Sequence, residues 1–442
     1  MISPSRHPAT SLRLWLLFFT TTISLSLSTG QLVKGRLITS IYSWEKFDTV
    51  GVSNTYTRGL QSILLDITQS DFSLHTHLQA ASLLQDKIDE LPDFRAYYLY
   101  AQWKNIADLA DLSLGRIPFF AGVGNGTVDG ARVIFRFAEN AYRVTAYGGA
   151  SVPTDLALTG WKPMKRNFIG GGQILTTALA NTRVGISYIA RSREQSPYWT
   201  QRTDDLSNLV TTYVMPELRK EQYASADLSY QFTGGHAYGR YDYDLGFERT
   251  LRGQVGARFD VSDDFSLSGE FIHRAPRTPF NSFFAVFSTS STDEVEGGVD
   301  FIATPGIRAF GRGAYVKYDG ENSFRYTLGA ACTYVNLSYQ GNSGFAGELS
   351  NISLEGVYPL CENMITPSIG FSYSSYKLNS SASRQSAYAG ALGATLRPLD
   401  WLSLDLQGQI LRNEIFKSDF RFFGKLNIWF SERFSIFGEK QP

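Results

Sequence analysis

The stretch LRGQVGARFDVSDDFSLSGEFIHR, residues 251–274, decides the fold class. Apolar and polar side chains alternate in both of its halves, and a short polar run at residues 262–264 separates the halves. A period of two residues gives each segment one apolar and one polar face, which is typical of β-strands. The stretch therefore predicts two antiparallel strands joined by a tight turn. The apolar positions are Leu251, Val255, Ala257, Phe259, Phe265, Leu267 and Phe271.

The same alternation recurs from about residue 35 to residue 430, for example at residues 71–80, 292–301 and 401–411. A soluble β-sandwich would also alternate, so further features are needed. The polar faces are often charged at successive positions, which suits a water-filled lumen. The strands run to about 10 to 14 residues, which exceeds the ~5 to 6 residues usual in soluble sheets and fits a tilted membrane strand.

The connections between the strands alternate in length. Short turns lie near residues 68–71, 138–140, 180–182, 233–236, 262–264, 303–306 and 398–400, and longer loops near residues 85–93, 117–130, 151–168, 194–220 and 276–292. Short periplasmic turns and long external loops are typical of outer-membrane barrels. We therefore expect an all-β fold, a transmembrane antiparallel up-and-down β-barrel of about 22 strands without a plug domain. Counts of 18 and 20 are the alternatives, and residues 333–345 form the weakest strand.

The overall composition excludes some classes of function. The 442 residues include 41 Lys and Arg and 41 Asp and Glu, so the net charge is zero and no nucleic-acid partner is expected. Cys332 and Cys361 are the two cysteines, and they lack the spacing of a metal site. Whether these cysteines pair is left open.

The two ends of the chain predict export. Arg6, His7 and Arg13 precede an apolar run at residues 14–28 and small residues follow, so residues 1–30 are interpreted as a signal peptide. A membrane anchor is the alternative, although this run falls short of the ~20 apolar residues that span a bilayer. We expect residues 31–430 to form the barrel and residues 431–442 a periplasmic tail, with a short extra strand as the alternative to the tail.

The glycine-rich stretch GRIPFFAGVGNGTVDGARV, residues 115–133, raises the question of a phosphate site. A phosphate-binding loop leads into a helix and usually carries a Lys. Here strand alternation follows the glycines instead, and no Lys follows them. The stretch is therefore interpreted as the long external loop of a hairpin, in which glycines allow positive φ angles and tight turns.

LSLGR at residues 112–116 and DGARV at residues 129–133 flank that loop. Together with YSWEKFD at residues 42–48, NSFFAVF at residues 281–287 and DFRFF at residues 419–423, this pattern resembles outer-membrane porins of the alginate-export and related porin-like type. The resemblance implies passive or facilitated diffusion of small polar solutes through a pore lined by arginines. Arg116 matches the arginine of the family pattern, and Asp129 its aspartate.

Charged residues on the polar strand faces are the candidates for lining the pore and its constriction. They could set up a transverse field that orients ions or zwitterions, or they could pair with one another and hold the barrel's shape. The segment at residues 274–291 is a candidate for an inward-folded loop or an external cap. With Arg116 and Asp129, the candidate residues are Arg240, Asp242, Asp244, Arg252, Arg258, Glu270, Arg274, Glu294, Glu296 and Asp300.

These features predict a porin-like channel rather than an enzyme, with no cofactor, in the outer membrane of a diderm (Gram-negative-type) bacterium. Expected partners are outer-membrane lipid, small polar solutes and the barrel-assembly machinery, with the protein as a monomer or a homotrimer. His75 and His77 lie on one strand face, where hydrated lumen histidines are favoured over metal ligands. The alternative is a barrel with a blocked lumen. A cluster of Ser, His and acid at one rim would indicate a hydrolase, and large apolar loop tips an adhesion scaffold.

Overall fold

The protein is described by a computed structural model. The structure describes residues 31–49, 52–84, 94–158, 163–194, 197–203, 209–215, 218, 220–277, 290–345, 347–378, 381–414 and 418–434. The expected signal peptide at residues 1–30 and the last residues of the expected tail, 435–442, lie outside these ranges.

The described residues form 24 strands. They are β1 (Gln31–Thr49), β2 (Val52–Gln69), β3 (Phe72–Leu83), β4 (Phe94–Ile106), β5 (Ala110–Ala121), β6 (Gly124–Phe137), β7 (Tyr142–Ser151), β8 (Phe168–Thr176), β9 (Thr182–Ser192), β10 (Tyr198–Thr203), β11 (Leu209–Val214), β12 (Lys220–Phe232), β13 (Gly235–Asp244), β14 (Arg249–Asp260), β15 (Phe265–Arg274), β16 (Thr292–Thr304), β17 (Ile307–Tyr318), β18 (Glu321–Cys332), β19 (Val335–Gly344), β20 (Glu348–Val357), β21 (Ile365–Lys377), β22 (Gln385–Leu399), β23 (Leu402–Arg412) and β24 (Asp419–Phe434).

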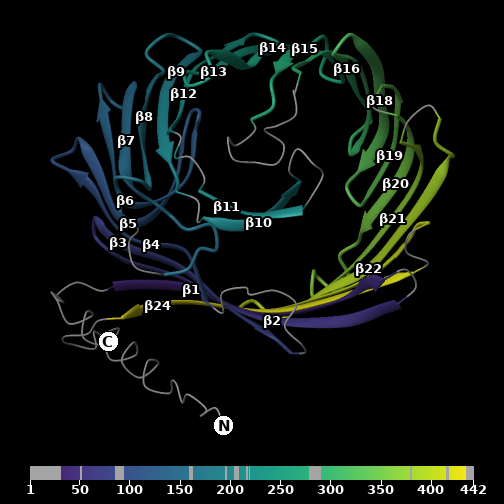
Figure 1. Cartoon of the computed structure of the whole chain (residues 1–442), viewed down its shortest axis with the longest axis horizontal. Helices are drawn as coiled ribbons and strands as arrows, with labels where there is room; N and C mark the ends of the chain where they lie inside the picture. The colour runs from purple at the N-terminus through teal and green to yellow at the C-terminus, as the bar shows by residue number, and fades with distance from the viewer. Residues whose placement is uncertain are drawn as a thin grey trace.

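Twenty-two of these strands close into one barrel (Figure 1). Each strand pairs antiparallel with its neighbours in the chain, except that β9 pairs with β12 and thereby leaves out the separate hairpin β10–β11. The first strand pairs with the last, from Gln31 opposite Phe434 to Trp44 opposite Arg421. The expected antiparallel barrel of about 22 strands is confirmed. Among the described residues no helix is present, so no helical plug domain is seen there.

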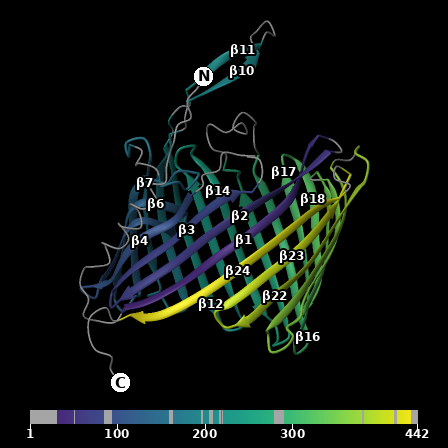
Figure 2. The same ribbon diagram turned by 90° about the horizontal axis from the view of Figure 1, so that it is seen from below.

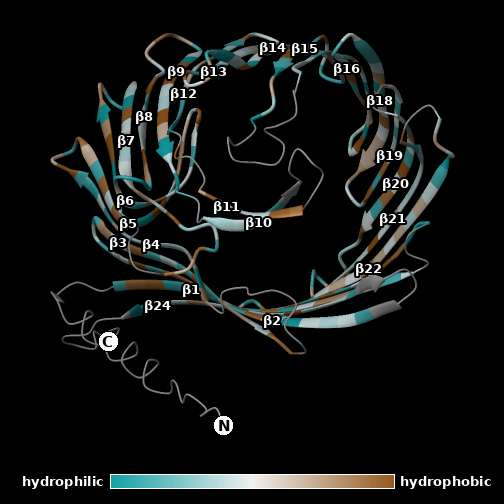
Figure 3. Cartoon of the chain, in the orientation of Figure 1, coloured by the Kyte–Doolittle hydropathy of each residue, from teal (hydrophilic) through white to brown (hydrophobic). Residues whose placement is uncertain are grey.

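The alternation in the sequence becomes two faces of the wall. One face carries exposed apolar side chains such as Val255, Leu328 and Ile369, which are 58%, 55% and 51% exposed. The other face carries polar side chains and points into the lumen. Figure 3 shows the apolar and polar residues alternating along the strands. None of the described residues belongs to a helix long and apolar enough to cross a membrane.

The two rims of the barrel differ. At one rim, here called the turn rim, the connections are short, for example at residues 70–71, 233–234 and 305–306. At the opposite rim, the loop rim, residues 152–167 and 193–219 connect β7 with β8 and β9 with β12. Figure 2 shows the tilted strands of the wall, with β10–β11 projecting well beyond the loop rim.

Two sequence expectations concern the strands near the C-terminus. The weakest predicted strand, at residues 333–345, is present as β19. The last strand was expected to end at residue 430, but β24 continues to Phe434 because residues 431–434 pair with the start of β1. The barrel boundary at residue 430 is therefore wrong by four residues, and the strand number stays even.

The hairpin of β5 and β6 departs from the wall. β5 pairs with β4 only as far as Arg116, and β6 pairs with β7 only as far as Val128. Residues 117–127 continue as a hairpin whose strands pair with each other, with a turn at Gly122 and Val123. We call residues 117–128 the inner hairpin, since its tip contacts the middle of β9 inside the barrel. The expectation of a long external loop at residues 117–130 is wrong.

Glycines at the base of the inner hairpin permit the close backbone approach that this bend needs. Gly115 has a φ of 126°, and a Cβ there would lie 2.4 Å from the carbonyl oxygen of Leu99. A Cβ on Gly130 would lie 2.2 Å from the carbonyl oxygen of Gly148. Backbone atoms in a strand ladder cannot move away without breaking hydrogen bonds, so side chains are excluded at these positions.

We therefore expect Gly130→Ala to lower the free energy of unfolding by about 1–3 kcal/mol, the usual cost of overpacking. The measurement is a urea titration of the refolded barrel in lipid vesicles. Gly269→Ala in β15 is the matched control, because a Cβ there meets nothing within 4 Å. It should change stability by no more than about 0.5 kcal/mol. Equal effects of the two substitutions would contradict this interpretation of the hairpin base.

Candidate functional site

The inner wall of the barrel divides into three sectors with different chemistry. The covered sector, formed by β7, β8, β9 and β12, lies behind the inner hairpin. The charged sector consists of the inward side chains of β13–β18. The small-residue sector consists of the inward side chains of β19–β22, where Ser338, Asn351, Ser353, Ser372 and Ser374 form short hydrogen bonds with one another. A solute in the lumen would therefore meet charge on one side and small neutral groups on another.

One face of the inner hairpin packs against the covered sector. Ile117, Phe119 and Val128 are at most 1% exposed. The Phe119 ring stacks on Tyr147 of β7 with centroids 4.0 Å apart. The backbone N–H of Val123 at the tip donates to Ser187 Oγ of β9 at 2.8 Å. Since Ser187 lies midway along β9, the tip is held about halfway down the lumen.

The opposite face of the inner hairpin is open. Phe120 alternates with Phe119 and Ala121, both of which pack toward the wall, so its ring points away from that wall. Its side chain is 87% exposed. A large apolar side chain at this depth narrows the lumen and gives a solute an aromatic surface to contact.

Arg116 and Asp129 hold the inner hairpin from behind. They are cross-strand partners, and Arg116 donates two hydrogen bonds to the Asp129 carboxylate at 2.7 and 2.9 Å. Arg116 also donates to the carbonyl oxygens of Ala96 and Leu156, at 3.0 and 2.9 Å, and is 4% exposed. Of the predicted pore-lining residues, these two are placed in a structural ion pair with little surface open to a solute.

The charged sector contains a cluster around Asp300 of β16. The Asp300 carboxylate is 4% exposed and accepts hydrogen bonds from Arg258, at 3.1 Å, and from Arg312, at 2.6 Å. Arg308 donates two further hydrogen bonds to the same carboxylate, one of them from its Nε at 3.0 Å. Arg258 also reaches Asp260 at 3.3 Å. The three arginines remain 25–53% exposed at their side chains, so their outer N–H groups face water in the lumen.

A second group lies on β13 near the loop rim. Asp242 is 1% exposed and pairs with Arg240 at 2.9 Å and Arg277 at 3.3 Å. Asp244 instead accepts the backbone N–H groups of Gly246 and Phe247 and so caps the turn after β13. The Arg277 guanidinium also lies over the Tyr223 ring, 4.9 Å from its centroid.

This Arg277 contact bears on the expected inward loop at residues 274–291. The described start of the loop, residues 275–277, follows the inner wall, with the Ala275 N–H donating to the Leu251 carbonyl at 2.8 Å. Residues 278–289 lie outside the described residues, so the choice between an inward loop and a cap stays open.

The acidic residues of β15 and β16 also have partners. Glu294 and Glu296 both accept from Arg325 of β18, the second at 3.1 Å. Glu270 accepts from the Tyr238 hydroxyl and from Gln254, the latter at 2.6 Å. These acids therefore brace neighbouring strands across the lumen face.

Arg252 and Arg274 differ from the other charged candidates. They lie directly opposite each other on β14 and β15. Arg252 donates to the Gln254 side chain, and Asp242 lies opposite it on β13; within the described ranges neither guanidinium is close enough to a carboxylate to form an ion pair. Two like charges facing each other repel, and an anion between them would relieve that repulsion. This arginine pair is the best candidate contact for an anionic group in the lumen.

A hydrogen-bonded chain of Ser, His and Asp lies on the inner face near the turn rim. Ser73 Oγ is 2.9 Å from His75 Nε2, and His75 Nδ1 is 2.6 Å from Asp66 Oδ1. This order matches a nucleophile, a base and an orienting acid. However, Ser73 is 3% exposed and lies within a paired strand, where its neighbours' N–H groups are used in the ladder. Among the described residues, no group of three or more His, Cys, Asp and Glu is placed to hold a metal.

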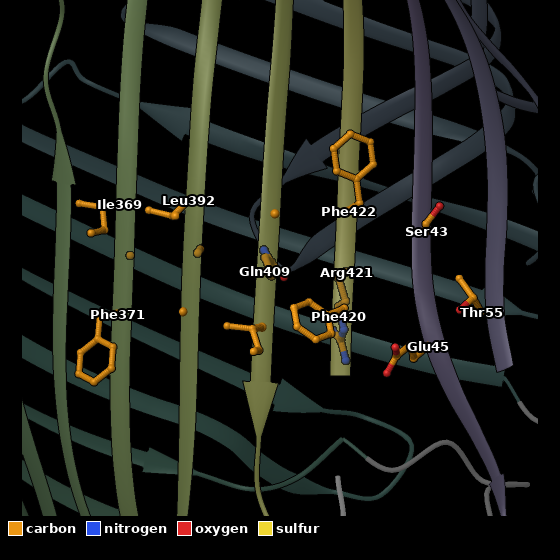
Figure 4. Close-up of a pocket in the computed structure, with 15 residues that line it drawn as sticks. Ser43, Glu45, Thr55, Ile369, Phe371, Leu392, Gln409, Phe420, Arg421 and Phe422 are labelled. Carbon is orange, nitrogen blue, oxygen red and sulfur yellow. The ribbon is translucent and has the colours of Figure 1, made fainter. Parts of the chain in front are cut away.

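A groove lies on the outer, membrane-facing wall of the barrel, away from a solute in the lumen. Figure 4 shows its apolar side chains, including Ile369, Phe371, Leu392 and Phe422, which are 45–67% exposed on the membrane-facing side. Its volume is about 720 Å³, and Glu45 lies at one end. The groove opens toward the membrane, not toward the lumen.

Cys332 and Cys361 are both exposed free thiols near the turn rim. The sequence leaves their pairing open, and in this structure the two side chains are unpaired.

Several functional residues were missed from the sequence. Arg308, Arg312 and Arg325 complete the acid clusters, and their alternation with apolar neighbours in β17 and β18 was the available signal. The inward face of β5 also changes from polar, at Asp111 and Ser113, to apolar, at Ile117 and Phe119. That change within one strand was the available sign that the hairpin leaves the wall.

Comparison with solved structures finds barrels that cover nearly the whole chain. OccAB4 of Acinetobacter baumannii matches at 10% identity over 92% of this chain and 99% of its own, with a TM-score of 0.38. The translocation pore of the P pilus usher PapC matches at 11% identity over 90% and 99%, with a TM-score of 0.42. OpdK of Pseudomonas aeruginosa, solved with vanillate, matches at 8% identity over 92% and 100%, with a TM-score of 0.41.

No family model and no curated protein matches this chain. With TM-scores of 0.38, 0.42 and 0.41, these barrels are only distantly similar to this chain. The resemblance to porins of the alginate-export type stays a prediction.

Removing Asp129 should destabilise the hairpin, because Asp129→Ala leaves the Arg116 charge buried without its carboxylate. We expect a loss of about 3–5 kcal/mol in the free energy of unfolding. The double variant Arg116→Met with Asp129→Leu removes both charges and should lose less than the single variant. Urea titrations of all three proteins measure this. A double-variant loss as large as that of Asp129→Ala, or larger, would contradict a coupled pair.

Truncating Phe120 should widen the lumen. We expect Phe120→Ala to raise single-channel conductance and Phe120→Trp to lower it, because this ring projects into the open space. Phe259→Ala is the control, since Phe259 is 52% exposed on the membrane-facing side. Its conductance should equal that of the wild type. If Phe120→Ala left the conductance unchanged, the ring would lie outside the narrowest part of the path.

Proposed function

We propose that this protein is an outer-membrane channel through which small polar or charged solutes diffuse passively. The observation that carries the proposal is a closed ring of 22 strands with a polar, charged inner face, narrowed by one inward hairpin. Barrels of 16 or more strands are wide enough to leave an aqueous path unless a further element fills them. The inner hairpin is fastened along one side of the wall and thus narrows the lumen rather than crossing it.

The charged sector supports solutes that carry charge. Most of its acids are engaged by arginines. Arg252 and Arg274 face each other, and neither forms an ion pair among the described residues, although Asp242 lies opposite Arg252 on the neighbouring strand β13. The small-residue sector provides mainly hydroxyl and amide groups, with Glu355 of β20 on the same face. A solute with an anionic group would therefore be drawn to the arginine pair while its remaining surface stays hydrated.

Transport without catalysis fits this site better than hydrolysis. The chain of Ser73, His75 and Asp66 is the one observation that favours the rim-site hydrolase. A nucleophile must reach the substrate, and donors must await the developing oxyanion. Ser73, at 3% exposure within a strand ladder, meets neither requirement. We assign this chain a bracing role between β2 and β3.

The cellular setting follows from the same proposal. We infer export through the signal peptide at residues 1–30, insertion by the barrel-assembly machinery and residence in the outer membrane of a Gram-negative-type bacterium. The turn rim would then face the periplasm and the loop rim the exterior. The exposed apolar side chains of the wall would contact lipid.

The test is single-channel recording of the refolded protein in a planar bilayer. We expect discrete, stable current steps, because a water-filled lumen conducts ions continuously. Heat-modifiable migration in gels confirms that the barrel has folded. A folded barrel that carries no current would overturn the proposal and return attention to a blocked lumen.

Replacing the arginine pair should change ion selectivity. We expect Arg252→Gln and Arg274→Gln, alone or together, to shift the reversal potential in a salt gradient toward cation preference, since positive charge leaves the lumen. Lys317→Gln is the matched control. Lys317 is two residues after Tyr315 on β17, so both side chains lie on the membrane-facing side. It removes one positive charge from outside the lumen and should leave the reversal potential unchanged. If the arginine variants and Lys317→Gln shifted the reversal potential equally, the arginine pair would not line the path.

A further inference from the structure

The hairpin of β10 and β11 stands apart from the barrel. Its two strands form a separate two-stranded sheet, in which Tyr198 lies opposite Val214 and Thr203 opposite Leu209. Figure 2 shows it projecting beyond the loop rim. Within the part of the chain that the structure describes, neither strand pairs with any other strand. Each strand therefore has one edge with unpaired backbone donors and acceptors.

Apolar side chains on this hairpin are exposed. Trp199 of β10 is 67% exposed even though its ring lies 4.9 Å from the Tyr213 ring. Along β11 and the residue after it, the exposed apolar side chains are Leu209 at 73%, Val210 at 45%, Tyr213 at 47% and Met215 at 74%. Such a patch on a projecting element is typical of an interaction surface.

The edge of β11 lacks the devices that usually prevent strand pairing. Residues 209–215 read LVTTYVM, with no charge, no proline and no glycine. Natural edge strands are protected by lysines, prolines or bulges, and an uncharged apolar edge is a template for another strand. β10 differs, because its sequence includes Arg202. A two-stranded hairpin is also marginally stable alone in water, and a third strand would stabilise it.

We propose that β11 is a self-association edge, on which β11 of a second copy of this chain pairs antiparallel. A twofold axis at Thr212 makes the segment self-complementary. Val210 then lies opposite Val214 of the partner copy, and Leu209 opposite Met215 of the partner copy. Thr211 lies opposite Tyr213 of the partner copy, so no like charges meet anywhere along the edge.

This pairing fits a second copy better than the side of the same barrel. The hairpin projects past the loop rim, and the barrel of the same chain does not cover the apolar side chains of β11, which remain exposed. Joining the two edges gives a four-stranded sheet from two chains, with main-chain hydrogen bonds along both copies of β11. The interface is isologous, because the same edge is used by both copies. It is independent of the channel, since no lumen residue takes part.

The experiment measures the mass of the refolded, full-length protein in detergent by mass photometry and analytical ultracentrifugation. We expect the wild type to form a dimer. Thr212→Lys sets two ammonium groups against each other at the axis and should convert the dimer to monomer. Thr200→Lys is the matched control, because Thr200 is the cross-strand partner of Thr212 on the same face of the hairpin but on β10. It should leave the dimer intact.

A charge-reversal pair tests the pairing itself. Thr212→Glu alone should also be monomeric, whereas an equal mixture of Thr212→Lys and Thr212→Glu should restore the dimer mass. Heat-modifiable migration of each variant shows that its barrel is folded. A monomeric wild type, or an oligomer of any size that Thr212→Lys leaves intact, would overturn the proposal. Equal loss in Thr200→Lys, or no rescue in the mixture, would place the contact elsewhere and also overturn it.

Discussion

Closure of the strand ladder between β1 and β24 is the constraint on which the rest of the structure depends. In hydrocarbon a backbone N–H or C=O without a partner costs several kcal/mol, so a membrane sheet must have no free edge. The first and last strands meet from Gln31 opposite Phe434 to Trp44 opposite Arg421. This length of pairing explains why the final strand extends past residue 430. Because β1 and β24 are antiparallel, closure also fixes an even strand number and brings both ends of the wall to the turn rim.

Closure constrains the backbone but not the inward side chains. The inner face can therefore differ in chemistry around the circumference, and it has three distinct sectors. Behind the inner hairpin Tyr147, Ile169 and Ile189 of the wall meet another apolar surface, and the polar side chain of Ser187 binds the hairpin tip. Along β13–β18 the wall is charged, and most charges brace their neighbours. Along β19–β22 small hydroxyl and amide side chains predominate, with Glu355 among them. A lumen with these unlike sides can orient a solute, which a uniformly polar tube cannot do.

The fold was predictable because a period of two persists along most of the strands, although it breaks at Leu251, which lies at a bulge and is 2% exposed in the cluster behind the inner hairpin. Val255, Phe259 and Phe271 face the membrane as their alternation indicated. The inner hairpin was not predictable in the same way, because glycines that usually mark an external turn here permit close backbone contact at Gly115 and Gly130. The charged candidates of β13–β16 stay a prediction as pore-lining residues, and their partners depend on cross-strand register. Register joins Arg252 to Arg274 and Arg116 to Asp129, and spacing along one chain does not specify it.

Passive diffusion requires that the lumen is an open path, which the inner hairpin narrows. Ile117 and Val128 are cross-strand partners, so residues 118–127 can be replaced by an Asn-Gly turn that closes the shortened hairpin. The most direct measurement compares the single-channel conductance of this variant with that of the wild type. We expect current through both proteins and a larger conductance in the shortened one. Equal conductances would contradict the role of the hairpin. The absence of ion current through both folded proteins would contradict the open lumen.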